Sequence, residues 1–184
     1  LISLTILIIF TPIFIFVFFV CLMESKQPIF IQKRVGKNKI PFNLIKFRTM
    51  KVDTIDCATH LVNPNKITYL GKFLRKSKLD EVPQLWNVLK GNMSMVGPRP
   101  CLGNQKELIK ARDKYRIFKI KPGITGLAQI KKIDMSEPKK LAKIEMQMIK
   151  NYNLYYYFYY IFLTLIGNGF GDRIRKKISN KKLI

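Results

Sequence analysis

Residues 70–100 read LGKFLRKSKLDEVPQLWNVLKGNMSMVGPRP and place two adjacent carboxylates, Asp80 and Glu81, inside a basic stretch. Ser77 stands three residues before Asp80, a spacing that resembles a capping box. This spacing predicts a helix that begins at Ser77 and ends near Lys90, where a glycine follows. The apolar stripe expected on that helix consists of Val82, Leu85, Trp86 and Leu89.

The acidic pair has two interpretations. Acidic residues favour the first turn of a helix because the backbone there carries a partial positive charge. Alternatively, nearby cations keep Asp80 ionised, as a carboxylate nucleophile requires. Neighbouring helical residues point about 100° apart, so Glu81 would then perform a different task, such as binding a metal ion.

Basic residues near this pair indicate a phosphate site. Arginine suits phosphate because its planar fork donates two parallel hydrogen bonds. A diphosphate beside two carboxylates also needs a counter-ion, and Mg²⁺ held by one carboxylate and phosphate oxygens supplies it. The sequence contains no Walker A, G-x-G-x-x-G or kinase motif, so phosphoryl chemistry would use another arrangement. The candidate phosphate ligands are Lys46, Arg48, Arg75 and Arg99.

Composition narrows the choice of partners. A chain of 184 residues suits one domain with attachments, and its formal charge of +23 predicts anionic partners. Because 48% of the residues are hydrophobic, a membrane is favoured over nucleic acid. Cys21, Cys57 and Cys101 are widely spaced and His60 stands alone, which indicates reduced thiols and neither a zinc site nor a disulfide framework.

Residues 1–23 carry no charge and are long enough to cross a hydrocarbon core of roughly 30 Å. Pro12 lies at the midpoint and should kink the helix, with the Thr11 hydroxyl available to the freed backbone group. The residues themselves leave a single span and a re-entrant hairpin open. Lys26, Lys33 and other basic residues follow, which places the remainder of the chain in the cytoplasm.

The middle of the chain contains segments typical of strands, a helix and loops. Two β-favouring stretches, PIFIQKRV and PFNLIKFRT, are joined by GKNK and predict a hairpin. Residues 67–77 predict a helix that lies either on an anionic membrane surface or on the domain core. The segments MSMVGPRP and IKPGITGLAQ predict long turn-rich loops, where ligand contacts concentrate.

The last third of the chain predicts two helices and a tail. Residues 137–150 form the first helix, and Leu154–Ile166 form a second that is too short to span a bilayer. The many aromatic residues of the second helix suit either a membrane interface or a buried position. Residues 173–184 are a basic tail.

Three segments together resemble the bacterial sugar transferase family, the monotopic phosphoglycosyltransferases that act on polyprenyl phosphate. They are IFIQKRVGKNKIPFNLIKFRTM, LGKFLRKSKLDEVPQLWNVLKGNMSMVGPRP and YRIFKIKPGITGLAQI, and the similarity covers roughly residues 1–130. The resemblance implies that an aspartate attacks the β-phosphate of a UDP-sugar, UMP leaves, and polyprenyl phosphate then takes the phosphosugar from the enzyme. It also implies Mg²⁺ as the metal and the first membrane-linked step of surface glycan assembly.

Carried onto this sequence, the resemblance makes Asp80 the nucleophile and Glu81 the Mg²⁺ ligand. Lys46, Arg75 and Arg99 match basic residues near the phosphates. The family's N-terminal helix is re-entrant and broken at a Ser-Pro pair. Thr11 and Pro12 stand in that place and keep a hydroxyl before the proline, so the resemblance favours the re-entrant form.

We therefore expect a mostly helical α+β enzyme, monotopic in the membrane, with a kinked N-terminal helix, a β-hairpin and interfacial helices. Residues 1–23 would be the membrane element, 24–172 the catalytic domain and 173–184 the basic tail. The expected place is the cytoplasmic face of the bacterial inner membrane. The expected partners are a UDP-sugar, undecaprenyl phosphate and inner-membrane lipids, without nucleic acid; the sugar and the oligomeric state stay open. The alternatives are a direct-displacement transferase and a non-enzymatic basic membrane-anchored binding protein.

Overall fold

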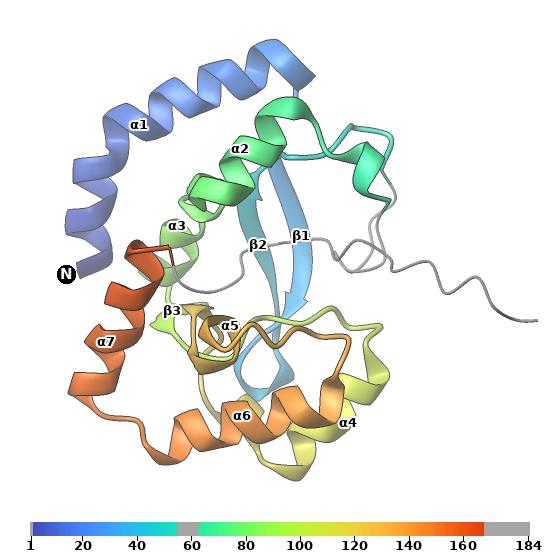
Figure 1. Cartoon of the computed structure of the whole chain (residues 1–184), viewed down its shortest axis with the longest axis vertical. Helices are drawn as coiled ribbons and strands as arrows, with labels where there is room; N and C mark the ends of the chain where they lie inside the picture. The colour runs from blue at the N-terminus through green and yellow to red at the C-terminus, as the bar shows by residue number, and fades with distance from the viewer. Residues whose placement is uncertain (1, 55–62, 168–184) are drawn as a thin grey trace, which may run out of the picture.

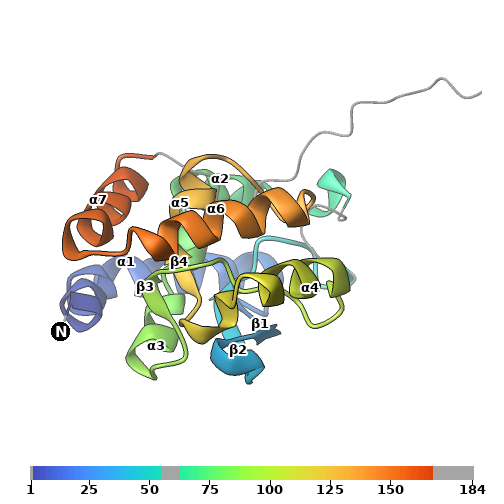
Figure 2. The same ribbon diagram turned by 90° about the horizontal axis from the view of Figure 1, so that it is seen from below.

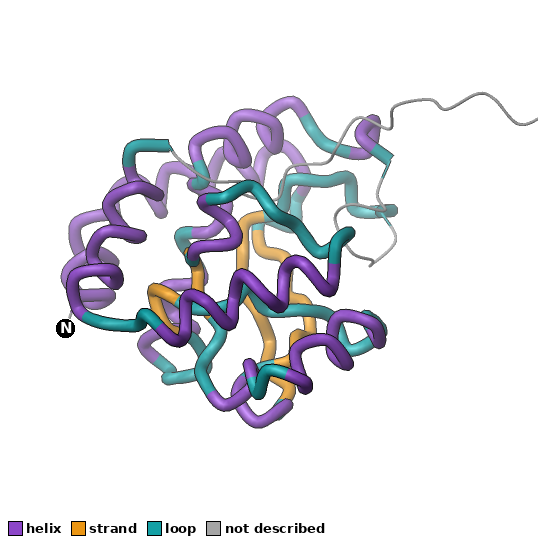
Figure 3. Tube along the Cα trace, turned by 60° about the horizontal axis from the view of Figure 1, so that its bottom comes forward, coloured by secondary structure: helices purple, strands orange, loops and turns teal. Residues whose placement is uncertain are grey.

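A β-hairpin forms the centre of the molecule, as the sequence predicts. In the computed structural model, which describes residues 2–54 and 63–167, strand β1 (Ile29–Val35) pairs antiparallel with β2 (Pro41–Phe47). The short turn η1 (Lys37–Lys39) joins them. Figure 3 shows the strands enclosed by helices, so the predicted mostly helical α+β class is confirmed. The predicted basic tail, Cys57 and His60 lie outside the described residues.

Helix α1 (Ile2–Ser25) precedes the hairpin and contains Pro12. Figure 1 shows it bent between its two halves, which confirms the predicted kink. Its second half packs Val17 and Cys21 against Phe47 of β2 and Leu74. Among residues 2–54 and 63–167, no helix combines the length and the apolar character needed to cross a membrane.

Helix α2 (Tyr69–Ser77) lies against the segment that follows β2. The Thr68 side chain caps it by accepting a hydrogen bond from the Gly71 N–H at 2.9 Å. A Cβ on Gly71 would stand only 2.1 Å from the Thr49 carbonyl oxygen, so only glycine permits this approach. The short turn η3 (Pro64–Lys66) leads into this region.

The prediction of one helix from Ser77 to Lys90 is wrong. Ser77 is the last residue of α2, and its hydroxyl donates to the carbonyl oxygens of Phe73 and Leu74 instead of capping a new helix. A 3₁₀ turn, η4 (Leu79–Glu81), follows, and α3 (Gln84–Leu89) begins only after Pro83, which lacks the N–H that would continue the turn. Within the predicted stripe Leu85 is buried, but Trp86 is 48% exposed.

The two predicted loops contain a pair of short strands. Strand β3 (Ser94–Val96) pairs in parallel with β4 (Gly123–Thr125). A Cβ on Gly123 would stand 2.0 Å from the nitrogen of Gly97, so the two backbones touch where each loop has its glycine. The loops therefore form one structural unit.

The remaining helices follow β3 in the chain and pack mainly on one another and on β3 and β4. They are α4 (Lys106–Lys114), α5 (Leu127–Ile130), α6 (Pro138–Lys150) and α7 (Leu154–Leu165), with the turn η5 (Ile117–Lys119) after α4. Figure 1 shows α4 and α6 at the end of the molecule opposite α1 and α2, with the hairpin running between the ends. Figure 2 shows α6 and α7 on one side, and the hairpin with α3 on the other. Helices α6 and α7 confirm the predicted helical segments.

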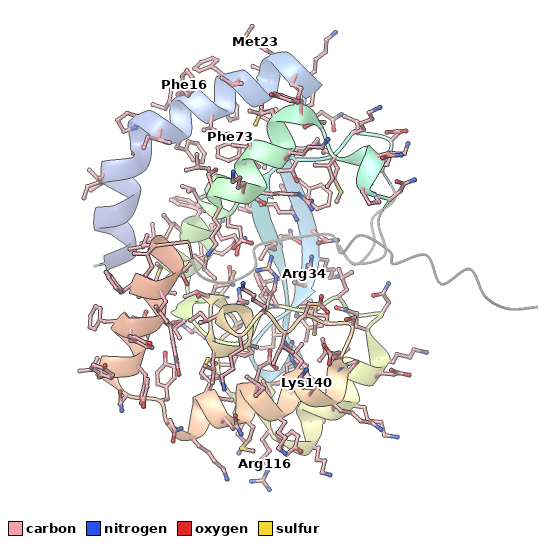
Figure 4. The ribbon with its side chains drawn as sticks, in the orientation of Figure 1. Phe16, Met23, Arg34, Phe73, Arg116 and Lys140 are labelled. Atoms are coloured by element: carbon pink, nitrogen blue, oxygen red, sulfur yellow. The ribbon has the colours of Figure 1, made fainter. Side chains whose placement is uncertain are left out.

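Large apolar side chains remain exposed on four helices, and we refer to this set as the apolar surface. Tyr160 is the buried aromatic anchor of α7, but Tyr155 is 70% exposed, so the alternative of a fully buried aromatic helix is wrong. Figure 4 shows Phe16 and Met23 pointing outward from α1. The apolar surface comprises Phe16, Phe19, Met23, Tyr69, Phe73, Trp86, Leu89, Leu154, Tyr155, Phe158, Phe162 and Leu165.

Candidate active site

The acidic pair lies in the turn between α2 and α3. Lys78 ends α2 in a left-handed conformation (φ 61°), and the Glu81 N–H then donates to the Lys78 carbonyl at 3.1 Å. A non-glycine residue in this region is uncommon and is typical of functional turns. Asp80 is 1% exposed and Glu81 is 6% exposed. The pair therefore belongs to a buried 3₁₀ turn and not to the first turn of the α-helix that the sequence predicts.

Glu81 and Arg99 form an ion pair across the site. Nη2 of Arg99 lies 2.9 Å from Oε1 of Glu81, and the side chains are 21% and 7% exposed respectively. The structure thus brings the Asp-Glu and Gly-Pro-Arg-Pro segments together, as expected of a single site. Arg99 is the more accessible partner, so an incoming anion meets it before it meets the carboxylate.

Arg75 and Lys46 lie on the two elements that contact η4, namely α2 and β2. Arg75 is 5% exposed, and its Nε donates to Oγ1 of Thr49 at 2.8 Å. Lys46 is 6% exposed, with its Nζ 5.5 Å from the centroid of the Phe30 ring. Both cations are held by specific neighbours inside the fold, unlike lysines that only solubilise a surface.

Arg48, the remaining predicted basic candidate, has a different environment. Its Nε donates to the Gln27 carbonyl at 3.0 Å, and its guanidinium carbon lies 5.4 Å from the centroid of the Phe30 ring. Burial lowers the pKa of Arg48 below its ordinary value. These contacts tie the end of β2 to the segment before β1.

Asn87 fixes α3 against the hairpin, and no sequence pattern predicts this role. Its side chain is 1% exposed and accepts a hydrogen bond from the Ile45 N–H at 3.0 Å. The same amide donates to the Asn43 carbonyl at 2.7 Å. Asn87 therefore completes the hydrogen bonding of β2 on the side away from β1, in the manner of a neighbouring strand.

The Gly-Pro-Arg-Pro segment is anchored through its carbonyl groups. Arg112 donates from Nη2 to the Arg99 carbonyl at 2.9 Å, and Arg34 donates from Nη1 to the Pro100 carbonyl at 3.1 Å. The Val35 N–H also donates to the Cys101 carbonyl at 2.9 Å. Figure 4 shows Arg34 near the centre of the molecule. Its position on the inward face of β1 follows from the alternation of side chains along a strand, since Gln32 and Arg34 are both buried.

The carboxylates at this site fit a magnesium ion only when it is shared with a substrate. Within the part of the chain that the structure describes, His, Cys, Asp and Glu side chains form no group of three that could hold a metal ion. Mg²⁺ is typically bound by one or two carboxylates together with substrate phosphates. A Glu81 carboxylate together with a diphosphate would meet that requirement.

Comparison with known proteins identifies the family of this chain. The bacterial sugar transferase family matches residues 1–168. The galactosyl transferase CpsE of Streptococcus agalactiae is 36% identical over 164 residues, covering 79% of this chain and 36% of that protein. The UDP-glucose:undecaprenyl-phosphate glucose-1-phosphate transferase of Escherichia coli is 33% identical over 178 residues, covering 91% of this chain and 38% of that protein.

The match with a shorter relative covers a larger share of that relative's length. The uncharacterized sugar transferase EpsL of Bacillus subtilis is 35% identical over 144 residues, covering 78% of this chain and 71% of that protein. The chain thus spans little more than a third of the two longer relatives and most of the shorter one. Because the match extends over residues 1–168, the chain belongs to the bacterial sugar transferase family.

Proposed function

We propose that this chain transfers a sugar-1-phosphate from a UDP-sugar to undecaprenyl phosphate through a covalent intermediate on Asp80. The observation that carries the proposal is the buried Asp80 carboxylate beside the Glu81–Arg99 ion pair. Relatives named for galactose, glucose and N-acetylgalactosamine transfer to undecaprenyl phosphate support this substrate class.

In the first step, a carboxylate oxygen of Asp80 forms a bond to the β-phosphorus of the UDP-sugar. The bond between that phosphorus and the oxygen bridging to the α-phosphorus breaks, and UMP leaves with the bridging oxygen. The sugar phosphate stays on Asp80 as an acyl phosphate. In the second step, a phosphate oxygen of undecaprenyl phosphate attacks the same phosphorus and the bond to Asp80 breaks, which restores the carboxylate.

The basic residues position and neutralise the diphosphate. Arg99 is the most accessible cation of the site and would receive it first, and Arg75 and Lys46 would neutralise charge from α2 and β2. Because Asp80 is 1% exposed, binding must also move the side chains that cover it. Such positioning and electrostatic stabilisation supply most of the rate enhancement in phosphoryl transfer.

Magnesium is part of the proposal. Glu81 would hold the ion together with the diphosphate, and the ion would neutralise charge that develops on the phosphate oxygens. Arg99 already neutralises Glu81 in the absence of substrate.

The apolar surface supports a place at the membrane. Exposed aromatic side chains suit the head-group region of a membrane. Helices α2 and α3 carry part of this surface and flank the turn that holds Asp80, which would bring the lipid phosphate to the nucleophile. We infer that α1 is re-entrant and that the site works at the cytoplasmic face of the inner membrane.

The decisive test incubates purified protein with Mg²⁺ and a panel of UDP-sugars that includes UDP-galactose, UDP-glucose and UDP-N-acetylgalactosamine. One sugar should give a phosphosugar adduct in the intact mass and release UMP in an amount equal to the enzyme, without any lipid. Asp80→Asn should give neither. A transferase that releases UMP only when undecaprenyl phosphate is present would use direct displacement. A steep salt dependence of DNA affinity, together with no turnover of any UDP-sugar, would favour a binding protein.

A further inference from the structure

A buried ion pair far from the acidic turn holds the backbone of Arg99. Arg112 of α4 donates from Nε and Nη2 to the two carboxylate oxygens of Glu145 in α6, at 2.8 and 2.5 Å. The side chains of Arg112 and Glu145 are 2% and 1% exposed. The same Nη2 also donates to the Arg99 carbonyl at 2.9 Å, so one guanidinium joins the two helices to the active-site segment.

The segment that carries Arg99 depends on such donors. Arg99 lies between Pro98 and Pro100, and proline has no N–H to donate to a neighbouring strand. Its backbone is instead fixed through carbonyl oxygens, which need donors from elsewhere in the fold. Arg112 supplies the donor at Arg99 itself, and the guanidinium of Arg99 then reaches Glu81.

Stability alone does not explain an ion pair at this position. Two buried apolar side chains of similar volume typically stabilise a protein as well as, or better than, a buried ion pair. Burial acts to lower the pKa of Arg112, but the charge and hydrogen bonds of Glu145, together with the contact with Cys101, outweigh it, and the pKa lies above its ordinary value. Arg112 therefore remains a charged donor, and an apolar replacement would leave the Arg99 carbonyl without it.

We propose that Arg112 and Glu145 form a positioning pair that holds Arg99 in place for the diphosphate. Neither residue touches the substrate. Glu145 orients the Arg112 guanidinium, which fixes the Arg99 backbone and through it the direction of the Arg99 side chain. The inference rests on the proposed function, because it assigns Arg99 to the diphosphate of a UDP-sugar.

The test uses a double substitution that keeps the core filled. Arg112→Met with Glu145→Leu removes both charges together, so no buried charge is left unpaired. Because the Arg99 carbonyl loses its donor, the melting temperature should fall by about 2–12 °C, but the protein should remain folded at the assay temperature. Its kcat/KM for the UDP-sugar should nevertheless fall by about 10- to 100-fold, the usual effect of removing an outer partner of a site residue. Lys140→Met with Glu137→Leu makes the same exchange at an exposed pair of α6 and should leave kcat/KM unchanged.

A double-mutant cycle separates positioning from general loosening of the fold. If Arg112 acts through Arg99, the pair substitution should cause no further loss of kcat/KM in an Arg99→Met background. If the loss of kcat/KM from the pair substitution is as large in the Arg99→Met background as in the wild type, the inference is overturned. A pair variant as active as the wild type would also overturn it. Arg112→Lys provides a second variant if the double substitution does not fold, because one ammonium cannot reproduce the forked contacts; full activity of this variant would likewise count against positioning.

A binding measurement distinguishes this inference from the proposed function. Calorimetric titration with UDP in the presence of Mg²⁺ should show about tenfold weaker binding to the pair variant than to the wild type. If the wild type releases no UMP from any UDP-sugar, the proposed function fails. If the wild type turns over while the pair variant binds UDP with equal affinity, only the positioning role fails.

Discussion

Asn87 offers the sharpest test of how the hairpin and the acidic turn are held together. Replacing it with leucine keeps nearly the same volume but removes both hydrogen bonds to β2, at Ile45 N–H and Asn43 C=O. A buried polar group left without its partner costs about 1–3 kcal/mol. The Asn43 side is partly open to water, so we expect a total loss of about 2–4 kcal/mol.

The loss should appear as a lower melting temperature, by about 5–15 °C, since 1 kcal/mol corresponds to about 2–4 °C in a chain of this size. Circular dichroism during heating in a mild detergent measures it. Asn43→Ala removes an exposed asparagine side chain from β2 itself and should change stability by less than about 0.5 kcal/mol. If Asn87→Leu has the same melting temperature as the wild type, these hydrogen bonds do not hold α3 to β2.

Three further changes test other parts of the structure. Gly71→Ala should destabilise the protein by about 3 kcal/mol in urea unfolding, because its Cβ would stand 2.1 Å from the Thr49 carbonyl oxygen, whereas Gly103→Ala, with no atom within 4 Å, should be harmless. Thr49→Val removes the hydroxyl that accepts from the Arg75 guanidinium and should lower kcat/KM by about tenfold, while Thr49→Ser should restore it. Phe158→Ser should weaken binding to anionic lipid vesicles by about tenfold in a flotation assay, and Ile40→Ser, which changes an exposed residue of the hairpin turn, should not. Equal vesicle binding by these last two variants would remove α7 from the membrane contact.

The hairpin and the longer helices were predictable because their signals are local. β-favouring residues mark β1 and β2, and helical spacing marks α2, α6 and α7. Strands β3 and β4 are three residues each, and they exist only because Ser94–Val96 meets Gly123–Thr125 from a distant part of the chain. No local sequence pattern indicates this pairing, so the sequence predicts loops for the two segments.

Of the positioning pair, the sequence indicates Glu145 but not Arg112. Glu145 lies four residues after Leu141 and three before Met148, so it falls on the apolar stripe of a helix that the sequence does predict. A charge on a buried stripe requires a partner. The sequence offers 34 basic residues, and only the packing of α4 on α6 selects Arg112.

The Glu81–Arg99 pair explains how opposite charges coexist in this buried site before substrate arrives. Each neutralises the other, so under the proposed function a diphosphate would separate them, with the phosphate on Arg99 and Mg²⁺ on Glu81. Glu81→Gln removes the competing carboxylate, so it should tighten Mg²⁺-free binding of UDP by about fivefold, since a partly exposed ion pair contributes up to about 1 kcal/mol. It should also reduce the gain in affinity that Mg²⁺ gives the wild type. Calorimetric titration with and without the ion measures both effects. If Glu81→Gln binds Mg²⁺-free UDP no more tightly than the wild type, Glu81 does not compete with the diphosphate for Arg99.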